Sequence, residues 1–189
     1  EQFDNPSIVG FSHYIWNENY NDTLARKIKE RWPECMIVYG GPQVPDVIDT
    51  WYTEHDFVDV CIHQEGEISF NEILKGTDFN LITGITYNHN GNWYGSGTSK
   101  RISKLEEIQS PYLLGLFDNL NVPDNYILNA IMETDRGCPY RCTFCDWGGT
   151  TFSKIKTFGL DRVFDEIEWA GRNSIEMINS ANANFGIFK

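Results

Sequence analysis

Three cysteines lie within eight residues in the last third of the chain. Cys138, Cys142 and Cys145 are spaced as C-x3-C-x2-C, so that one short loop can present three thiols to a single centre. Thiolate sulfur is a soft ligand that favours zinc, copper(I) or an iron-sulfur cluster. The spacing therefore indicates a metal centre in this loop.

An iron-sulfur cluster fits this loop better than structural zinc or a disulfide. Structural zinc takes four Cys or His ligands, yet all four histidines lie upstream of the loop and no cysteine follows Cys145. An odd third thiol, in a chain that does not look like a secreted scaffold, argues against a disulfide framework. The other two cysteines, Cys35 and Cys61, are expected to be packed, neutral thiols. A four-iron four-sulfur cluster on three cysteines leaves one iron open for a substrate or cofactor.

The sequence around these cysteines resembles the radical S-adenosylmethionine (radical SAM) superfamily. Phe144 supplies the aromatic residue of the pattern C-x3-C-x-aromatic-C, and the string from Glu133 to Gly148 resembles the cobalamin-binding branch. The resemblance implies that Cys138, Cys142 and Cys145 hold a 4Fe-4S cluster whose open iron chelates SAM. Electron transfer then cleaves the sulfonium and releases a 5′-deoxyadenosyl radical. Phe144 is expected beside the adenine, or as packing that shields the cluster from water.

Two asparagines near the end of the chain are the remaining candidate contacts to SAM. The string from Asn182 to Gly186 resembles a D-A-N-F-G string of the branch, at the end of a strand expected over residues 175–179. Asn182 stands where the branch usually has Asp, which removes a charge that could pair with the methionine ammonium. An amide still accepts a hydrogen bond, so the Asn182 substitution is expected to weaken SAM binding rather than abolish it. Asn184 is the second candidate SAM contact. Both asparagines could instead serve turn chemistry.

Composition bounds the kind of protein. Fifteen basic and twenty-seven acidic residues give a net charge of −12, which argues against a nucleic-acid partner. No apolar run approaches the roughly 18 residues of a membrane span, and no signal peptide is present, so a cytoplasmic location is expected. At 189 residues the chain suits one domain or two small or partial ones. Because it begins at Glu1 with a strand close behind, we expect a fragment of a longer protein.

The N-terminal part alternates short apolar strands with helices, which predicts an α/β fold with a partial doubly wound parallel sheet. The first helix is expected to start at Asn21 or Asp22 and to end at Pro33, with every fourth residue from Tyr20 to Trp32 facing the core. The expected strands cover residues 7–12, 36–39 and 57–62, and the later helices cover residues 45–54 and about 67–75.

The loops after these strands form the second candidate site, because doubly wound sheets bind ligands beyond the carboxyl ends of their strands. The sequence has no G-x-G-x-x-G, so a dinucleotide is not supported. The loops resemble those of cobalamin-binding domains, although they could be plain turns. A D-x-H-x-x-G motif is missing, so neither His13 nor His63 is assigned as a cobalt ligand. The resemblance makes candidate cobalamin contacts of Ser12, Tyr14, Gly40, Gly41, Pro42, Glu65 and Gly66.

A β-hairpin and an irregular connection separate the two candidate sites. Asn90-Gly91 supplies the positive φ angles of a type I′ turn within residues 84–94. A strand over residues 126–133, a helix over residues 160–170 and a strand over residues 175–179 then predict the first βαβ of a radical SAM partial (β/α)6 barrel. The expected division is residues 1–80 for a partial cobalamin-binding domain, 81–125 for the hairpin and linker, and 126–189 for the start of the radical SAM domain.

The resemblance implies a truncated cobalamin-dependent radical SAM enzyme, and methyl transfer to an unactivated carbon of a small-molecule substrate is its expected reaction. An external electron donor of the flavodoxin or ferredoxin type is the expected partner. One alternative is a radical SAM enzyme without cobalamin, such as a methylthiotransferase or an oxidative cyclase. Another is a non-catalytic module that binds a cluster or a corrin.

Overall fold

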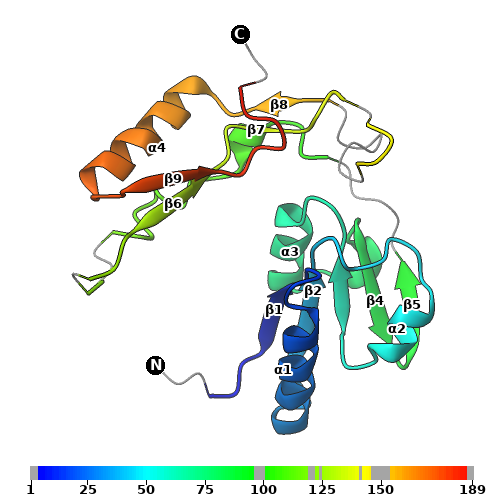
Figure 1. Cartoon of the computed structure of the whole chain (residues 1–189). Helices are drawn as coiled ribbons and strands as arrows, with labels where there is room; N and C mark the ends of the chain where they lie inside the picture. The colour runs from blue at the N-terminus through cyan, green and yellow to red at the C-terminus, as the bar shows by residue number, and fades with distance from the viewer. Residues whose placement is uncertain are drawn as a thin grey trace. The chain divides into compact units, whose positions relative to one another are not determined.

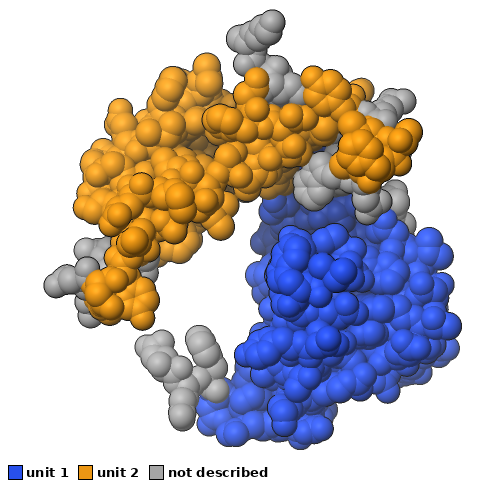
Figure 2. Space-filling view, viewed as in Figure 1, with its two compact units in different colours: residues 1–102 blue, residues 103–189 orange. Residues whose placement is uncertain are grey.

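The chain folds into two compact units, residues 1–102 and residues 103–189 (Figures 1 and 2). The fold is that of a computed structural model. Among the residues it describes, no helix combines the length and the apolarity needed to span a membrane. The described residues are 4–95, 101–118, 122–123, 125–140, 142–145 and 154–186.

The first unit contains a five-stranded sheet in the order β1-β2-β3-β4-β5. The first three strands are parallel, as predicted, and β4 and β5 continue the sheet as an antiparallel hairpin (Figure 1). Asn90 and Gly91 have φ values of 53° and 80°, so the predicted type I′ geometry of the hairpin turn is confirmed. The strands are β1 (Ile8–Ser12), β2 (Met36–Gly40), β3 (Val60–Ile62), β4 (Ile85–His89) and β5 (Asn92–Gly95).

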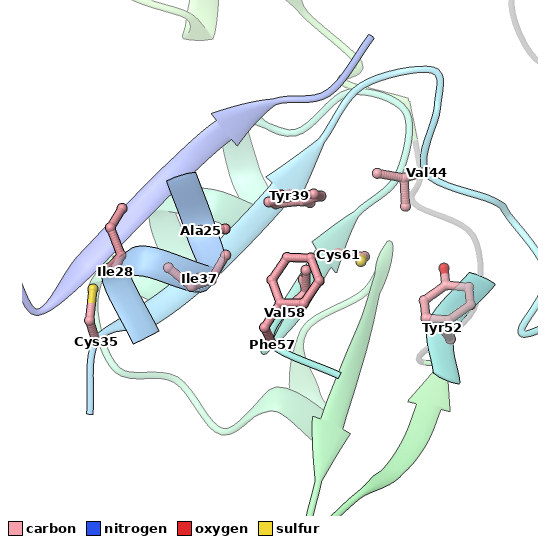
Figure 3. Close-up of a cluster of buried hydrophobic side chains, with 10 residues drawn as sticks. All are labelled: Ala25, Ile28, Cys35, Ile37, Tyr39, Val44, Tyr52, Phe57, Val58 and Cys61. Carbon is pink, nitrogen blue, oxygen red and sulfur yellow. The ribbon is translucent and has the colours of Figure 1, made fainter. Parts of the chain in front are cut away.

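Helices cover both faces of this sheet, because alternate residues of a strand point to opposite sides. In β2, Ile37 and Tyr39 pack in one buried cluster with residues of α1 and α2, and Figure 3 shows its ten side chains. Val38 faces the other way and packs with Ile73 of α3. Burial on both sides explains why these strands are continuously apolar. The helices are α1 (Glu18–Arg31), α2 (Thr50–Glu54) and α3 (Glu67–Leu74), and a 3₁₀ turn, η1 (Phe79–Leu81), follows α3.

Three details of the predicted helices were wrong. Helix α1 begins at Glu18, with Asn17 as its N-cap residue, and not at Asn21 or Asp22. Of the predicted face, Ile28 is buried, but Tyr20 and Leu24 are exposed, and Asn21 and Ala25 complete the buried face of α1. Asn21 turns inward because its side-chain amide donates to the Ser12 carbonyl at 2.9 Å, and the small Ala25 lets α1 lie close to the sheet. Helix α2 is also shorter than expected, because the Asp49 side chain accepts a hydrogen bond from the Trp51 amide and caps the helix there.

The second unit contains the expected βαβ. Strands β6 (Asn129–Met132) and β9 (Met177–Ser180) are parallel neighbours, and α4 (Leu160–Arg172) lies between them in sequence (Figure 1). A small core of Met132, Trp169 and Ala170 joins helix and strands. A short antiparallel pair, β7 (Asp135–Arg136) with β8 (Lys156–Thr157), was not predicted, and a 3₁₀ turn, η2 (Leu105–Glu107), lies near the start of the unit.

Candidate functional site

The three predicted cluster ligands follow β7 directly and are free thiols. Cys138 is half-buried, whereas Cys142 and Cys145 are exposed. Gly137 has a φ of 114°, a value that glycine adopts easily, and it turns the chain out of β7 into the loop. The Cys145 amide donates to the Cys142 carbonyl at 3.0 Å, which curls the loop between these two ligands. Residues 146–148 of the family-like string lie outside the described residues.

The remaining two cysteines differ from these in their surroundings. Cys35 and Cys61 are 1% and 0% exposed and pack in the core of the first unit. Burial raises the pKa of both thiols, so both stay protonated at neutral pH. Since the thiolate is the form that binds metal, only the loop cysteines are suitable ligands among the five.

Asn184 lies against the first of the loop ligands. Its side-chain amide donates a hydrogen bond to Cys138 Sγ at 3.2 Å, although the two residues are 46 positions apart. The pairing of β6 with β9 brings them together, because β7 and the cysteine loop follow β6 and Asn184 follows β9. A hydrogen bond to a ligand sulfur withdraws electron density from an iron-sulfur cluster and affects its reduction potential. Asn184 is thus positioned to act on the cluster ligand itself.

The side-chain amide of Asn182 is hydrogen-bonded to other groups of the protein. Its amide nitrogen donates to Thr134 Oγ1 at 2.7 Å and, through a short contact, to the Asp135 carboxylate. Its amide oxygen accepts from Ser180 Oγ at 2.7 Å. Asp135 is buried, so an aspartate at position 182 would place two carboxylates side by side without the amide donor. The asparagine therefore fits the Asp135 environment of this chain.

Phe144 is 91% exposed, so its ring is not packed against the rest of the protein. Phe185, next to Asn184, is 76% exposed as well. Exposed aromatic rings beside a ligand loop leave their faces available for stacking on a planar group such as adenine. Phe185 belongs to the same D-A-N-F-G-like string as Asn182 and Asn184, and this membership is the signal that indicates it in the sequence.

The loops after β1 and β2 pack closely on one another in the first unit. The His13 amide donates to the Gly40 carbonyl at 2.7 Å, which continues the strand pairing beyond Ser12. Gly41 has a φ of 124°, and a Cβ atom there would lie 2.5 Å from the His13 carbonyl oxygen. The second glycine of the pair is therefore required by contact between two loops. Ser12, Gly41 and the neighbouring Pro42 are exposed, and Gly40 is half-buried.

The β1 loop also carries an aromatic surface. The rings of Tyr14 and Trp16 stack with centroids 4.6 Å apart and an interplanar angle of 16°. Trp16 is 76% exposed and Ile15 is 74% exposed. We call these three residues, Tyr14, Ile15 and Trp16, the strand-end ledge. Of these three residues only Tyr14 was predicted as a contact, and the aromatic-x-aromatic pair shortly after a strand is the sequence signal for the other two.

The β3 loop contributes less surface than predicted. Glu65 is buried, and its carboxylate accepts from the Ile102 amide at 2.6 Å and lies 3.6 Å from Arg101 Nε. It therefore fastens the last residues of the first unit to this loop. Gly66 is half-buried and precedes α3, and a Cβ atom there would lie 3.1 Å from Ile62 Cγ2.

Neither histidine of these loops is exposed. His63 is held between Thr86 Oγ1 at 2.8 Å and Asp46 Oδ1 at 3.3 Å. His13 is fully buried and packs against the Tyr39 ring with centroids 4.6 Å apart. Burial lowers the pKa of both imidazoles. Both side chains are therefore part of the protein interior in this conformation.

Comparison with known proteins shows close relatives along almost the whole chain. No family model matches the sequence. The chain is 37% identical over 190 residues to the cobalamin-dependent radical SAM methyltransferase TokK of Streptomyces tokunonensis, a match that covers 96% of the chain and 28% of TokK. It is 36% identical, with the same two coverages of 96% and 28%, to the 2-(S-pantetheinyl)-carbapenam-3-carboxylate methyltransferase of Streptantibioticus cattleyicolor. The chain thus spans about a quarter of the length of these curated relatives.

A solved structure supports the same relationship at the level of the fold. The chain is similar to the radical S-adenosylmethionine methyltransferase TsrM of Kitasatospora setae, solved with tryptophan substrate and a SAM analog, with a TM-score of 0.65 and 16% identity. That match covers 97% of the chain and 38% of TsrM. The cysteine spacing, the βαβ that presents it and the relatives that share the sequence agree with one another, and we conclude that the chain belongs to the cobalamin-binding branch of the radical SAM superfamily.

Proposed function

We propose that the chain carries cofactor-binding parts of a cobalamin-dependent radical SAM methyltransferase. The observation that carries the proposal is the cysteine loop, which has three free thiols at the family spacing. Cys142 and Cys145 are exposed, and Cys138 Sγ accepts a hydrogen bond from the Asn184 amide. These thiols fit a 4Fe-4S cluster with one open iron. When bound, such a cluster supplies the electron that cleaves SAM. Residues 126–189 then begin the radical SAM domain, and residues 1–80 form most of a cobalamin-binding domain joined to it through residues 81–125.

The side chains of the second unit suit different tasks around SAM. Cys138, Cys142 and Cys145 hold the cluster, and Phe144 offers its exposed ring to the adenine. Asn184 donates a hydrogen bond to Cys138 Sγ, so its main role is to affect the cluster rather than to contact SAM. Asn182 holds the turn after β9 in place through its hydrogen bonds to Thr134 and Asp135. Its amide oxygen already accepts from Ser180, so it contacts SAM only by accepting a further hydrogen bond.

Cobalamin is assigned to the carboxyl ends of β1 to β3. The exposed residues there are Ser12, Ile15, Trp16, Gly41 and Pro42. The Trp16 ring, stacked on that of Tyr14, provides a flat apolar surface for a corrin. Tyr14, Gly40 and Gly66 line the same edge half-buried, and Glu65 supports it from inside. TsrM, which has the same fold, has been solved with cobalamin and a [4Fe-4S] cluster bound.

The proposed reaction is methyl transfer to an unactivated carbon of a small-molecule substrate. The names of the two curated relatives indicate methyl transfer for those proteins. An external flavodoxin- or ferredoxin-type protein is the proposed electron donor. The cytoplasm is the proposed location, since free cysteines and iron-sulfur clusters persist in a reducing compartment.

Hydroxocobalamin titration of the chain, followed by corrin absorption, tests the cobalamin assignment. We expect saturable binding, and we expect Trp16→Ala to weaken it about tenfold, or roughly 1.4 kcal/mol, because a large apolar contact is lost. Tyr126→Ala, an exposed aromatic residue of the second unit, is the matched control and should leave binding unchanged. Absence of binding by the unmodified chain would favour a radical SAM protein without cobalamin.

Asn184→Ala is expected to lower the midpoint potential of the reconstituted cluster by about 40–80 mV. The loss of one hydrogen bond to a charged sulfur is worth about 1–2 kcal/mol, and about 59 mV corresponds to 1.4 kcal/mol for one electron. A redox titration monitored by electron paramagnetic resonance measures this shift. Asn179→Ala, on β9 and exposed, serves as control. Equal potentials in both variants would show that the Asn184 contact does not act on the cluster.

A further inference from the structure

A second group of potential metal ligands lies inside the first unit, far in sequence from the cysteine loop. His13 follows β1, Asp22 belongs to α1 and His55 follows α2. One ligand atom from each of them lies within 4.8 Å of the other two. His13 is 0% exposed, His55 is also buried, and the Asp22 side chain is 23% exposed. The fold therefore gathers two imidazoles and a carboxylate in a site with one partly open side.

The hydrogen bonds of His55 leave one of its nitrogens facing a carboxylate. His55 Nδ1 lies 2.7 Å from the Trp51 carbonyl oxygen, which can only accept, so this nitrogen carries a hydrogen. In the neutral ring, Nε2 then has a lone pair, and it lies 3.1 Å from Asp22 Oδ2. Two lone pairs at that distance require a proton or a cation between them. The Trp51 ring stacks on His55 at 3.9 Å and holds this orientation.

Asp22 is also oriented by a neighbour. The Tyr39 hydroxyl donates a hydrogen bond to Asp22 Oδ1 at 2.9 Å. The other oxygen, Oδ2, is the one that faces His55. In metal sites, ligating histidines donate their second N–H to a carbonyl and ligating carboxylates are themselves hydrogen-bonded. His55 and Asp22 both show this arrangement.

His13 supplies the third observation. Both of its ring nitrogens lack a hydrogen-bond partner among the described residues, although the side chain is fully buried. An unsatisfied buried polar group costs about 1–3 kcal/mol. A neutral imidazole offers a lone pair on one of its two nitrogens. A cation bound by that nitrogen would remove part of this cost.

We propose that His13, Asp22 and His55 form a binding site for a divalent transition metal ion of the zinc type, separate from the cysteine cluster. Two imidazoles and one carboxylate are ligands that zinc and its first-row neighbours accept. Zinc bonds to these atoms are about 2.0–2.2 Å long, so two ligand atoms on one ion lie roughly 3.3 Å apart. The 3.1 Å separation of His55 Nε2 and Asp22 Oδ2 agrees with that value.

The remaining geometry indicates a structural site. His13 must move by at most roughly 1.5 Å, since its ligand atom already lies within 4.8 Å of the others. A water molecule completes the coordination on the partly open side of Asp22. The ion ties the end of β1 to α1 and to the end of α2, and it fixes the segment that leads directly into the strand-end ledge.

Titration with Co²⁺ tests the site without interference from the cluster. The chain carries Cys138→Ala, Cys142→Ala and Cys145→Ala and is freed of metal before Co²⁺ is added. We expect one Co²⁺ per chain, with the d–d absorption of a nitrogen- and oxygen-ligated ion and no thiolate charge-transfer bands. His13→Gln and His55→Gln should each weaken binding at least about 100-fold, since even outer partners of metal ligands contribute about 10–100-fold. His89→Gln, at the exposed hairpin tip, should not change it.

Two results overturn the proposal: no Co²⁺ binding by the parent chain, or equal binding by the parent and His13→Gln. The first result would show that the three residues bind no metal ion, and the second would show that His13 is not a ligand. If His13→Gln does not fold, the Tyr39→Phe variant tests the site in its place, because it removes the hydrogen bond to Asp22 and keeps the aromatic ring. Tyr39→Phe is expected to weaken Co²⁺ binding about tenfold, and unchanged binding would contradict the site.

Discussion

Gly41→Ala is expected to lower the free energy of unfolding of the first unit by about 3 kcal/mol or more. The residue has a φ of 124°, in a region that is populated almost only by glycine, and such strain costs about 1–3 kcal/mol. A Cβ atom would also lie 2.5 Å from the His13 carbonyl oxygen and 3.1 Å from the His13 nitrogen. His13 cannot move aside easily, because its amide is bonded to Gly40 and its side chain is buried.

The adjacent glycine provides the matched control for this prediction. At Gly40 the nearest atom to a new Cβ is the Ile62 carbonyl oxygen at 3.8 Å, an ordinary contact, so Gly40→Ala should change the free energy by less than about 1 kcal/mol. Gly91→Ala separates strain from contact, because Gly91 has a φ of 80° and no atom within 4 Å. Its expected cost is about 1–2 kcal/mol. Urea denaturation followed by circular dichroism measures all three, and equal costs at Gly40 and Gly41 would contradict the loop-packing explanation.

The elements that local signals define could be predicted from the sequence. The three parallel strands of the first unit are short runs of β-branched and aromatic residues, and Asn90-Gly91 determines its turn through backbone preference alone. The cysteine loop could also be predicted as a metal-binding candidate, because its three cysteines lie within eight residues. Helix α1 shows where local pattern fails, since Asn21 is turned inward by a hydrogen bond to Ser12, and a period of four residues cannot indicate that contact.

Contacts between distant residues could not be predicted. Asn184 reaches Cys138 only because β6 pairs with β9, and β7 is a two-residue strand too short to leave a pattern. Glu65 looked like a loop residue open to a ligand, but it is buried by a bond to the Ile102 amide. The grouping of His13 with His55 depends on helix packing, and it carries no spacing signal. Long-range polar contacts therefore decide the finer roles at both candidate sites.

Cys142→Ala is expected to abolish a stable four-iron cluster, the largest functional effect of any single substitution considered. In the proposed assignment each of the three loop thiols is a ligand, and a cluster that already has one open iron cannot lose another ligand and stay intact in water. Cys35→Ala removes a thiol of the same chemistry from the core and should leave the iron content near that of the unmodified chain, provided that the variant folds. Iron and sulfide analysis after anaerobic reconstitution measures both.

The central claim is that this loop holds a cluster with an iron open to SAM, and cofactor binding can be tested without turnover. The chain spans 28% of the length of TokK, so the whole reaction is not required of it. The most direct measurement is electron paramagnetic resonance of the reduced, reconstituted cluster with and without SAM. The account predicts a four-iron signal that changes when SAM is added and is missing in Cys142→Ala. A bound zinc ion, or a cluster signal indifferent to SAM, would contradict it.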